Sequence, residues 1–238
     1  MLSIKNNRKG GRAGGISRVE AELLCADSRE SEVESWRVFK ILAELVSGFD
    51  FLRGYGRAAT VFGSSRCAAG DAVYQEAEEL SRRLVAAGFA VITGGASGVM
   101  QAANKGAKEA GGKSVGFNIT LPKPQEANTY TTDSHEFHYF FTRKVMLSFA
   151  SEVYIFFPGG FGTLDEFFEM LTLVQTKKIK PVPIILIGRD YWRPLLSWFE
   201  ETLKGARYRT IGEEDMCLYD LVESVDEAMA VVARRVRR

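Results

Sequence analysis

The sequence has 238 residues, of which 46% are hydrophobic and 26% are charged. This length supports one sizeable core and is short for two independent domains, so we expect a single domain. The 31 Lys and Arg residues nearly balance the 30 Asp and Glu residues, which leaves a formal net charge of +1. This balance excludes the global basic field that is typical of non-specific nucleic-acid binding, and no nucleic-acid partner is expected.

Cysteine usage and hydropathy give an expectation for the compartment. The three cysteines, Cys25, Cys67 and Cys217, have no CxxC spacing, which predicts neither a disulfide framework nor a zinc site and fits a reducing environment. The first twenty residues lack the apolar stretch of a signal peptide, and no run reaches the roughly 18 apolar residues of a membrane span. We therefore expect a cytoplasmic protein without a membrane partner.

Residues 1–30 are rich in Gly, Arg, Lys and Ser and show no apolar periodicity. We expect a basic extension without fixed structure there, and a single nucleotide-binding domain over residues 31–238. A nucleic-acid-binding tail is the alternative for the extension, but no aromatic residue interrupts its basic residues.

The folded part is predicted to open with an amphipathic helix that packs on the sheet or on a partner. Five apolar residues recur there at helical spacing: Trp36, Phe39, Leu42, Leu45 and Val46.

Short apolar runs and helical patterns alternate after this first helix. The predicted strands cover 58–65, 89–95, 113–119, 152–157 and 181–188. The predicted helices cover 71–88, 99–112, 142–151, 164–178 and 191–204. This alternation indicates an α/β fold: a Rossmann-like, doubly wound, mostly parallel sheet with helices on both faces. In such sheets ligands bind at the carboxyl ends of the strands, beside a topological switch point.

Three predicted strands end in glycine or small hydroxyl residues, in "FGSSR" (62–66), "TGGASG" (93–98) and "PGGFGT" (158–163). Glycine lets backbone N–H groups approach an anion, and the helix that follows directs its positive end to the same point. A tight turn would explain any one of these loops, whereas three at one sheet edge predict a phosphate site. The predicted substrate-binding residues are Gly63, Ser64, Gly94, Gly95, Lys144, Pro158, Gly159, Gly160, Gly162 and Thr163.

Two further features decide between an anion site and a simple turn. "TLDE", Thr163 to Glu166, matches a capping box, in which the hydroxyl and the carboxylate satisfy backbone donors at a helix start. This alternative does not explain the preceding glycines, nor Arg143 and Lys144 at the head of the previous predicted helix. An arginine there can hold a phosphate or a carboxylate with two N–H groups. Neither GxxxxGK[ST] nor GxGxxG with an acidic residue about 20 positions later is present, which disfavours a P-loop kinase and a standard dehydrogenase.

"PGGFGTLDE" resembles the PGGxGTxxE motif of the LONELY GUY family, cytokinin riboside 5′-monophosphate phosphoribohydrolases formerly described as "possible lysine decarboxylases". "VITGGASGVMQAANKGA" is similar to the second glycine loop of that family and its helix. The resemblance covers roughly Ala58 to Asp226, and the 23 residues from Arg143 to Glu166 agree with the spacing of the family's catalytic pair. The extension before about Ser31 lies outside it.

The resemblance implies hydrolysis of the N-glycosidic bond of a nucleoside 5′-monophosphate, AMP or a cytokinin riboside monophosphate, without a cofactor and by a homodimer. The phosphate would lie on the N–H groups of Gly159, Gly160, Gly162 and Thr163 at the positive helix end. Glu166 would then face the ribose and stabilise an oxocarbenium-like state, while Arg143 holds the ribose phosphate and keeps Glu166 ionised. A lysine decarboxylase would need pyridoxal phosphate bound to a lysine, and Lys144 is the only lysine beside the predicted site.

Several alternatives stay open. His135 and His138 have no third ligand in view, so no metal is expected, although either could lie in the base pocket. Glu169, one turn after Glu166, is either an assistant or a surface residue. No acid for the leaving base is identified. The alternative function is a nucleotide-binding sensor or carrier without turnover, because related folds bind nucleotides without cleaving them.

Overall fold

The computed structural model describes residues 35–121 and 128–236. The predicted basic extension over residues 1–30 lies outside these residues and stays a prediction. Two units divide the chain, Met1–Lys40 and Ile41–Arg238, and apart from the first residues of helix α2 the features discussed below belong to the second unit. Among the described helices, none combines the length and the hydropathy that crossing a membrane requires.

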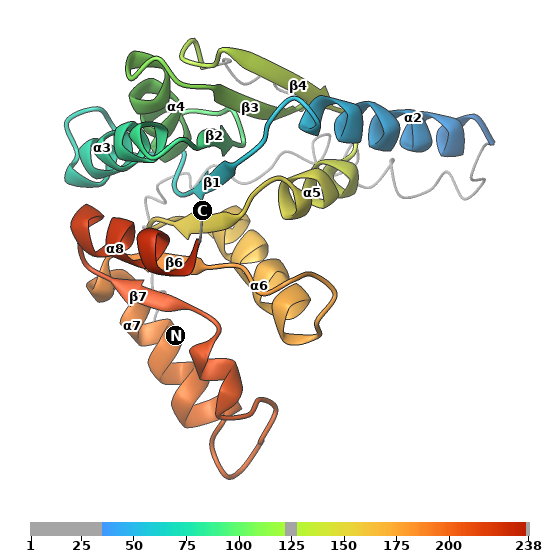
Figure 1. The fold of residues 1–238 in the computed structure, drawn as a ribbon. Coiled ribbons are helices and arrows are strands. Elements are labelled where there is room, and N and C mark those ends of the chain that lie inside the picture. Colours follow the sequence, from blue (N-terminus) through green and yellow to red (C-terminus); the bar gives the residue numbers. More distant parts are fainter. Residues whose placement is uncertain (1–34, 122–127, 237–238) are drawn as a thin grey trace, which may run out of the picture. The chain divides into compact units, whose positions relative to one another are not determined.

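A seven-stranded sheet forms the centre of the second unit (Figure 1), with every neighbouring pair of strands parallel. The strands are β1 (Ala58–Phe62), β2 (Ala90–Thr93), β3 (Ser114–Ile119), β4 (Asp133–Phe137), β5 (Val153–Phe156), β6 (Ile184–Ile187) and β7 (Asp220–Val222). They lie in the order β4-β3-β2-β1-β5-β6-β7. The predicted α/β class with a parallel sheet is confirmed.

Helices cover both faces of the sheet. They are α2 (Ser35–Leu52), α3 (Ala72–Ala86), α4 (Val99–Glu109), α5 (Phe140–Phe149), α6 (Phe161–Gln175), α7 (Arg189–Trp198) and α8 (Val225–Arg235). Side chains of β1 divide between two hydrophobic cores because successive residues of a strand point to opposite faces. Ala59 and Val61 pack with α3, α4 and α8, whereas Ala58 and Phe62 pack with α5, α6 and α7. This two-sided burial explains why the central strands read as continuous apolar runs.

The predicted helix before the first strand is present as α2. Leu45 of this helix packs against the second core, together with Phe51 and Leu52 near its end. Leu42 and Val46 remain 54% and 55% exposed, so the sheet does not cover them, and packing on a partner, the other predicted possibility, stays a prediction.

The predicted strand and helix ranges do not include β4, β7 or α8. Strand β4 lies at the edge of the sheet, and its side chains alternate between partly buried and exposed until Phe137. Its sequence therefore lacks the apolar run that marks the central strands. β7 has only three residues, too few for a periodic signal. The helix predicted over 191–204 begins at Arg189 as α7 and continues from Phe199 to Leu203 as a π-helix.

Strands β1 and β5 are neighbours although some 90 residues separate them, and the chain turns to the other half of the sheet between β4 and β5. The switch point of the fold therefore lies between β1 and β5. The loops after these two strands are joined there, because the backbone N–H of Ser64 donates to the carbonyl of Pro158 at 3.0 Å. Two of the three glycine loops thus meet where a ligand is expected.

Candidate functional site

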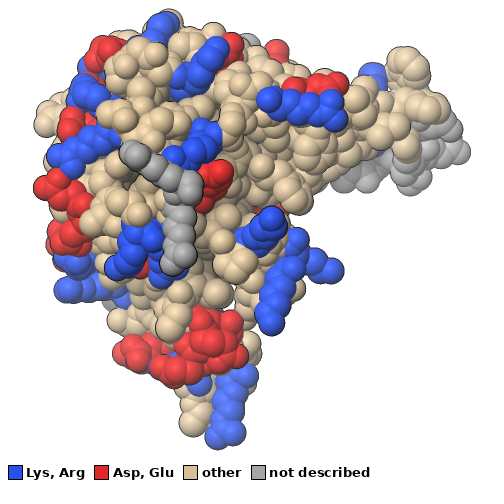
Figure 2. Space-filling view, in the orientation of Figure 1, with Lys and Arg blue, Asp and Glu red and all other residues tan. Residues whose placement is uncertain are grey.

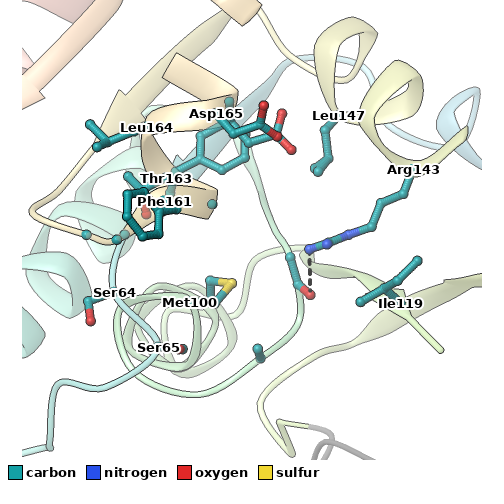
Figure 3. A pocket seen from close by; sticks show the side chains of 18 of the residues that line it. Ser64, Ser65, Met100, Ile119, Arg143, Leu147, Phe161, Thr163, Leu164 and Asp165 are labelled. Atoms are coloured by element: carbon teal, nitrogen blue, oxygen red, sulfur yellow. Dashed lines mark hydrogen bonds between the residues drawn. The ribbon is translucent and has the colours of Figure 1, made fainter. Parts of the chain in front are cut away.

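A cavity of about 780 Å³ opens at the switch point (Figure 3), a size that suits a small-molecule ligand. The loops after β1, β2 and β5 line it together with the first turns of α5 and α6. The lining residues are Phe62, Gly63, Ser64, Ser65, Arg66, Gly94, Ala96, Met100, Ile119, Leu121, Phe140, Arg143, Leu147, Gly159, Gly160, Phe161, Gly162, Thr163, Leu164, Asp165 and Glu166.

Most residues predicted for the site line this one cavity. Seven of the ten predicted substrate-binding residues do so, and Arg143 and Glu166 join them. Gly95, Pro158 and Lys144 are not part of the lining. The N–H of Gly95 donates to the hydroxyl of Thr93 at 2.9 Å, and the carbonyl of Pro158 accepts from the backbone N–H of Ser64. Direct substrate contact by these three residues was predicted, and their placement does not support it.

The positive end of α6 faces the cavity. This helix begins at Phe161 after Gly160, and no side chain caps it. The predicted capping box is therefore wrong, because Thr163 and Glu166 lie inside the helix rather than at its start. The N–H of Thr163 donates to the Gly160 carbonyl at 3.0 Å, so Thr163 cannot present this N–H to a phosphate as expected.

The N–H groups of Gly160, Phe161 and Gly162 remain for an anion. Within residues 35–121 and 128–236, none of the three donates to another backbone carbonyl. A Cβ placed on Gly160 or Gly162 would meet no atom within 4 Å. The missing side chains therefore leave space in front of these donors, at the end of a helix whose dipole attracts negative charge.

Arg143 extends from α5 into the cavity, and its guanidinium group lies beside the loop of Gly94 (Figure 3). Its Nε donates to the carbonyl of Phe117 at 2.7 Å, and Nη2 donates to the carbonyl of Gly94 at 3.3 Å. Burial lowers the pKa of Arg143, and the field of Glu166 opposes this, but a guanidinium remains charged at neutral pH. Two of five N–H groups are used in this way, so the others can reach a ligand.

Glu166 lies in the second turn of α6 at the cavity wall. Burial raises the pKa of Glu166 to about 8, and Glu169 adds to this effect, while the positive charges of Lys144 and Arg143 oppose it. The expectation that Arg143 keeps Glu166 ionised is therefore wrong for the free protein. Desolvation of the carboxylate outweighs both positive charges, so the carboxyl group is largely protonated near neutral pH.

Lys144 joins α5 to α6 instead of facing the cavity. Its Nζ lies 2.6 Å from a carboxylate oxygen of Asp165 and 3.2 Å from one of Glu169. Glu169, left open between two roles, is thus the ion-pair partner of Lys144 and does not line the cavity. Of the charged groups that act on Glu166, Lys144 has the largest effect.

Two residues that support the site were missed in the sequence. Glu44 of α2 accepts hydrogen bonds from the N–H of His138 at 2.8 Å and of Tyr139 at 3.3 Å, and from the Thr142 hydroxyl at 2.6 Å. It thereby holds the segment just before α5, the helix that carries Arg143. Because the two helices lie far apart in sequence, no local pattern could reveal this contact. Tyr191 of α7 donates its hydroxyl proton to the Gly159 carbonyl.

The histidines do not contribute to the cavity. The ring of His135 packs 5.1 Å from the ring of Phe51, and the ring of His138 packs 4.8 Å from that of Tyr139. Neither histidine lines the cavity, so the structure does not support the alternative of a histidine in the base pocket. The described part of the chain contains no group of three His, Cys, Asp or Glu residues that could hold a metal ion.

Comparisons with known proteins agree with the geometry. A family model described as "possible lysine decarboxylase" matches residues 100–232, more than half of the chain. The chain belongs to this family, that of the LONELY GUY proteins. A cytokinin riboside 5′-monophosphate phosphoribohydrolase of Rhodococcoides fascians is 31% identical over 150 residues, which cover 60% of this chain and 74% of the relative. A probable enzyme of the same name from Oryza sativa subsp. japonica is 28% identical over 169 residues, covering 65% of this chain and 66% of the relative.

Solved structures of the same fold include the molybdenum cofactor carrier protein of Chlamydomonas reinhardtii. Its TM-score is 0.56 at 25% identity, and the match covers 75% of this chain and 96% of that chain. Members of this fold are thus named as hydrolases in some organisms and as a carrier in another. The fold alone therefore does not distinguish a hydrolase from a carrier, and the distinction depends on the residues that line the cavity.

Proposed function

We propose that the chain hydrolyses the N-glycosidic bond of nucleoside 5′-monophosphates to free base and ribose 5-phosphate. One observation carries the proposal: a single cavity joins an open, positive helix end to a partly buried arginine and a carboxyl group with a raised pKa. Relatives named as cytokinin riboside 5′-monophosphate phosphoribohydrolases support this reaction. AMP and a cytokinin riboside monophosphate are the candidate substrates.

The phosphate would bind at the start of α6, on the N–H groups of Gly160, Phe161 and Gly162. Ser64 and Arg66 line the same cavity and can add a hydroxyl and a positive charge. The base would lie against the apolar part of the lining, formed by Met100, Ile119, Leu121, Phe140 and Leu147.

Glu166 would act first as an acid and then as a base. Its protonated carboxyl group donates a proton to the leaving base as the bond from C1′ to the base nitrogen breaks and its electron pair passes to the base. The resulting carboxylate stabilises the oxocarbenium-like sugar and then takes a proton from the water that attacks C1′. Arg143 orients the ribose with its remaining N–H groups and stabilises the carboxylate once the proton has left.

The test of this function is base release from a panel of nucleoside monophosphates, with adenosine as the matched control. We expect AMP or its N6-alkylated form to be cleaved at least about 100-fold faster than the corresponding nucleoside, because the phosphate contributes binding energy that the nucleoside lacks. Chromatography of free base measures both rates. Equal rates would refute the phosphate site, and no release from any nucleotide would refute the enzyme.

The acid role of Glu166 predicts a pH dependence. Because the carboxyl group of the free protein has a pKa of about 8, kcat/KM should fall about tenfold per pH unit above that value. Initial rates of base release, with circular dichroism at each pH to confirm folding, measure the profile. A rate that rises through pH 8 would instead identify the ionised carboxylate as the active form.

A carrier or sensor without turnover is the second candidate, and the likeness to the molybdenum cofactor carrier protein supports it. Such a protein needs the anion site but not the carboxyl group beside it. The homodimer and the cytoplasmic location stay predictions. The exposed apolar side chains of Leu42, Val46 and Phe49 on α2 support the first, and the free thiols of Cys67 and Cys217 support the second.

A further inference from the structure

A cluster of buried polar side chains lies behind the cavity wall and touches none of the ligand space. Thr93, Asn104 and Ser114 are completely buried, and Asn128 is 5% exposed. They come from the end of β2, the middle of α4, the start of β3 and the segment before β4. Buried polar groups destabilise a protein unless they are hydrogen-bonded, so such a cluster needs an explanation.

The amide of Asn104 is the centre of this cluster, which we call the Asn104 network. Its Oδ1 accepts from the hydroxyl of Thr93 at 2.6 Å and from Nδ2 of Asn128 at 2.7 Å. Its Nδ2 donates to the hydroxyl of Ser114 at 2.9 Å and to the carbonyl of Val115 at 3.3 Å. The two donors and two acceptor positions of the amide are therefore all satisfied, which fixes its orientation.

The Asn104 network holds the glycine loop after β2. The hydroxyl of Thr93 donates to Asn104 and accepts from the N–H of Gly95 at 2.9 Å. Gly95 has a φ of +72°, a conformation that glycine adopts readily and other residues rarely do, and this hydrogen bond helps to fix the turn. Asn128 adds a weaker contact from Nδ2 to the carbonyl of Ala96 at 3.4 Å.

The loop in turn touches Arg143. The Gly94 carbonyl accepts from Nη2 of Arg143, the bond drawn as a dashed line in Figure 3. A Cβ on Gly94 would lie only 2.2 Å from Nη2, so the guanidinium packs directly on this backbone. The second acceptor, the carbonyl of Phe117, lies in β3 two residues after Val115, which Asn104 also contacts. Both acceptors of Arg143 therefore belong to segments that the network fixes.

We infer that Thr93 and Asn104 are positioning residues for Arg143, which set the place of its guanidinium by fixing the Gly94 carbonyl. Neither residue touches the cavity, so their effect on a reaction passes through the groups that the network holds, which are Arg143 and the loop of Gly94. The inference rests on the proposed function for its kinetic consequence, but the geometry that it predicts can be measured without turnover.

A pair of substitutions at one position separates positioning from stability. Thr93→Val keeps the shape and removes the hydroxyl, which leaves the N–H of Gly95 without its acceptor. Thr93→Ser keeps the hydroxyl and loses a methyl group from a packed core. We expect base release to fall about tenfold or more in the valine variant, mainly in kcat, because small displacements of an orienting group are costly, and to stay within about twofold in the serine variant.

Ala107→Gly provides the matched control for helix stability. Ala107 is buried on α4 like Asn104, but it lies outside the network, and glycine weakens the helix. Below its melting temperature this variant should retain wild-type turnover. An equal loss of turnover in the glycine variant, or in Thr93→Ser, would overturn the inference, because activity would then follow stability rather than the hydroxyl.

The second readout is the NMR resonance of the Arg143 Nε–H, assigned by its disappearance in Arg143→Ala, together with hydrogen exchange of the Gly95 amide. In Thr93→Val we expect faster exchange at Gly95 and a shifted, faster-exchanging Nε–H, with Thr93→Ser close to the wild type. If the wild type releases no base, the proposed function fails while this measurement still tests the positioning. An unchanged Nε–H resonance in Thr93→Val would overturn the inference whatever the protein catalyses.

Discussion

Glu166→Gln should reduce base release by at least about 100-fold while the protein stays folded. Glutamine preserves the shape of the side chain but can neither donate the proton to the leaving base nor carry the negative charge that stabilises an oxocarbenium-like sugar. Structural capping, which would make this substitution mild, is excluded by a helix that begins at Phe161 without a side-chain cap. The rate of free base formation from AMP, measured at saturating substrate, tests the expectation.

The same substitution should make the protein more stable at pH 8 and above. The pKa of Glu166 is about 8 in the folded chain, against an ordinary value of 4.5, so the folded state holds its proton over a range in which the unfolded state has lost it. Stability therefore falls as the pH rises from about 4.5 to about 8, by up to about 5 kcal/mol, because one pKa unit corresponds to about 1.4 kcal/mol. Glutamine has no such proton, so the difference between variant and wild type should vanish at pH values below about 4.5.

Glu169→Gln is the control for this experiment. It changes the same charge one turn further along α6, where the side chain pairs with Lys144 and does not line the cavity. We expect it to retain most of the turnover. Normal turnover in Glu166→Gln, or an equal loss in Glu169→Gln, would show that Glu166 has no specific chemical role.

The class of the fold and the location of the site could be predicted because both depend on local signals. Buried parallel strands give apolar runs, and glycines after these runs mark the carboxyl edge of the sheet, where Gly63, Gly94 and Gly160 indeed line one cavity. The charged surface agrees with the composition, since Figure 2 shows groups of Lys and Arg beside groups of Asp and Glu over the visible face.

Interactions between distant segments could not be predicted. The place of Lys144 depends on the angle between α5 and α6, which brings it to Asp165 rather than to the cavity. The segment before α5 is held by Glu44, nearly 100 residues earlier. The state of Glu166 depends on how much water its neighbours exclude, a quantity that only the packed structure contains. In each case the sequence contains both residues, but no local pattern indicates that they come into contact.

Arg143→Ala should lower turnover by at least about 100-fold and weaken AMP binding much less. The substitution removes the positive charge that stabilises the Glu166 carboxylate after proton transfer, so its largest effect falls in the transition state. It also leaves the carbonyls of Phe117 and Gly94 without their donor. Arg143→Lys should recover only part of the rate, because an ammonium group cannot reproduce the planar fork that reaches both carbonyls.

Arg66→Ala is the matched comparison, because Arg66 lines the same cavity and is assigned to the phosphate rather than to the ribose in the proposed complex. It should raise KM more than it lowers kcat, the opposite of Arg143→Ala. Calorimetric titration of AMP beside the assay for free base separates binding from turnover in each variant. A carrier would give a different pattern: both substitutions would only weaken binding, and the wild type would bind AMP tightly without ever releasing adenine. This result would refute the hydrolase and favour the carrier or sensor.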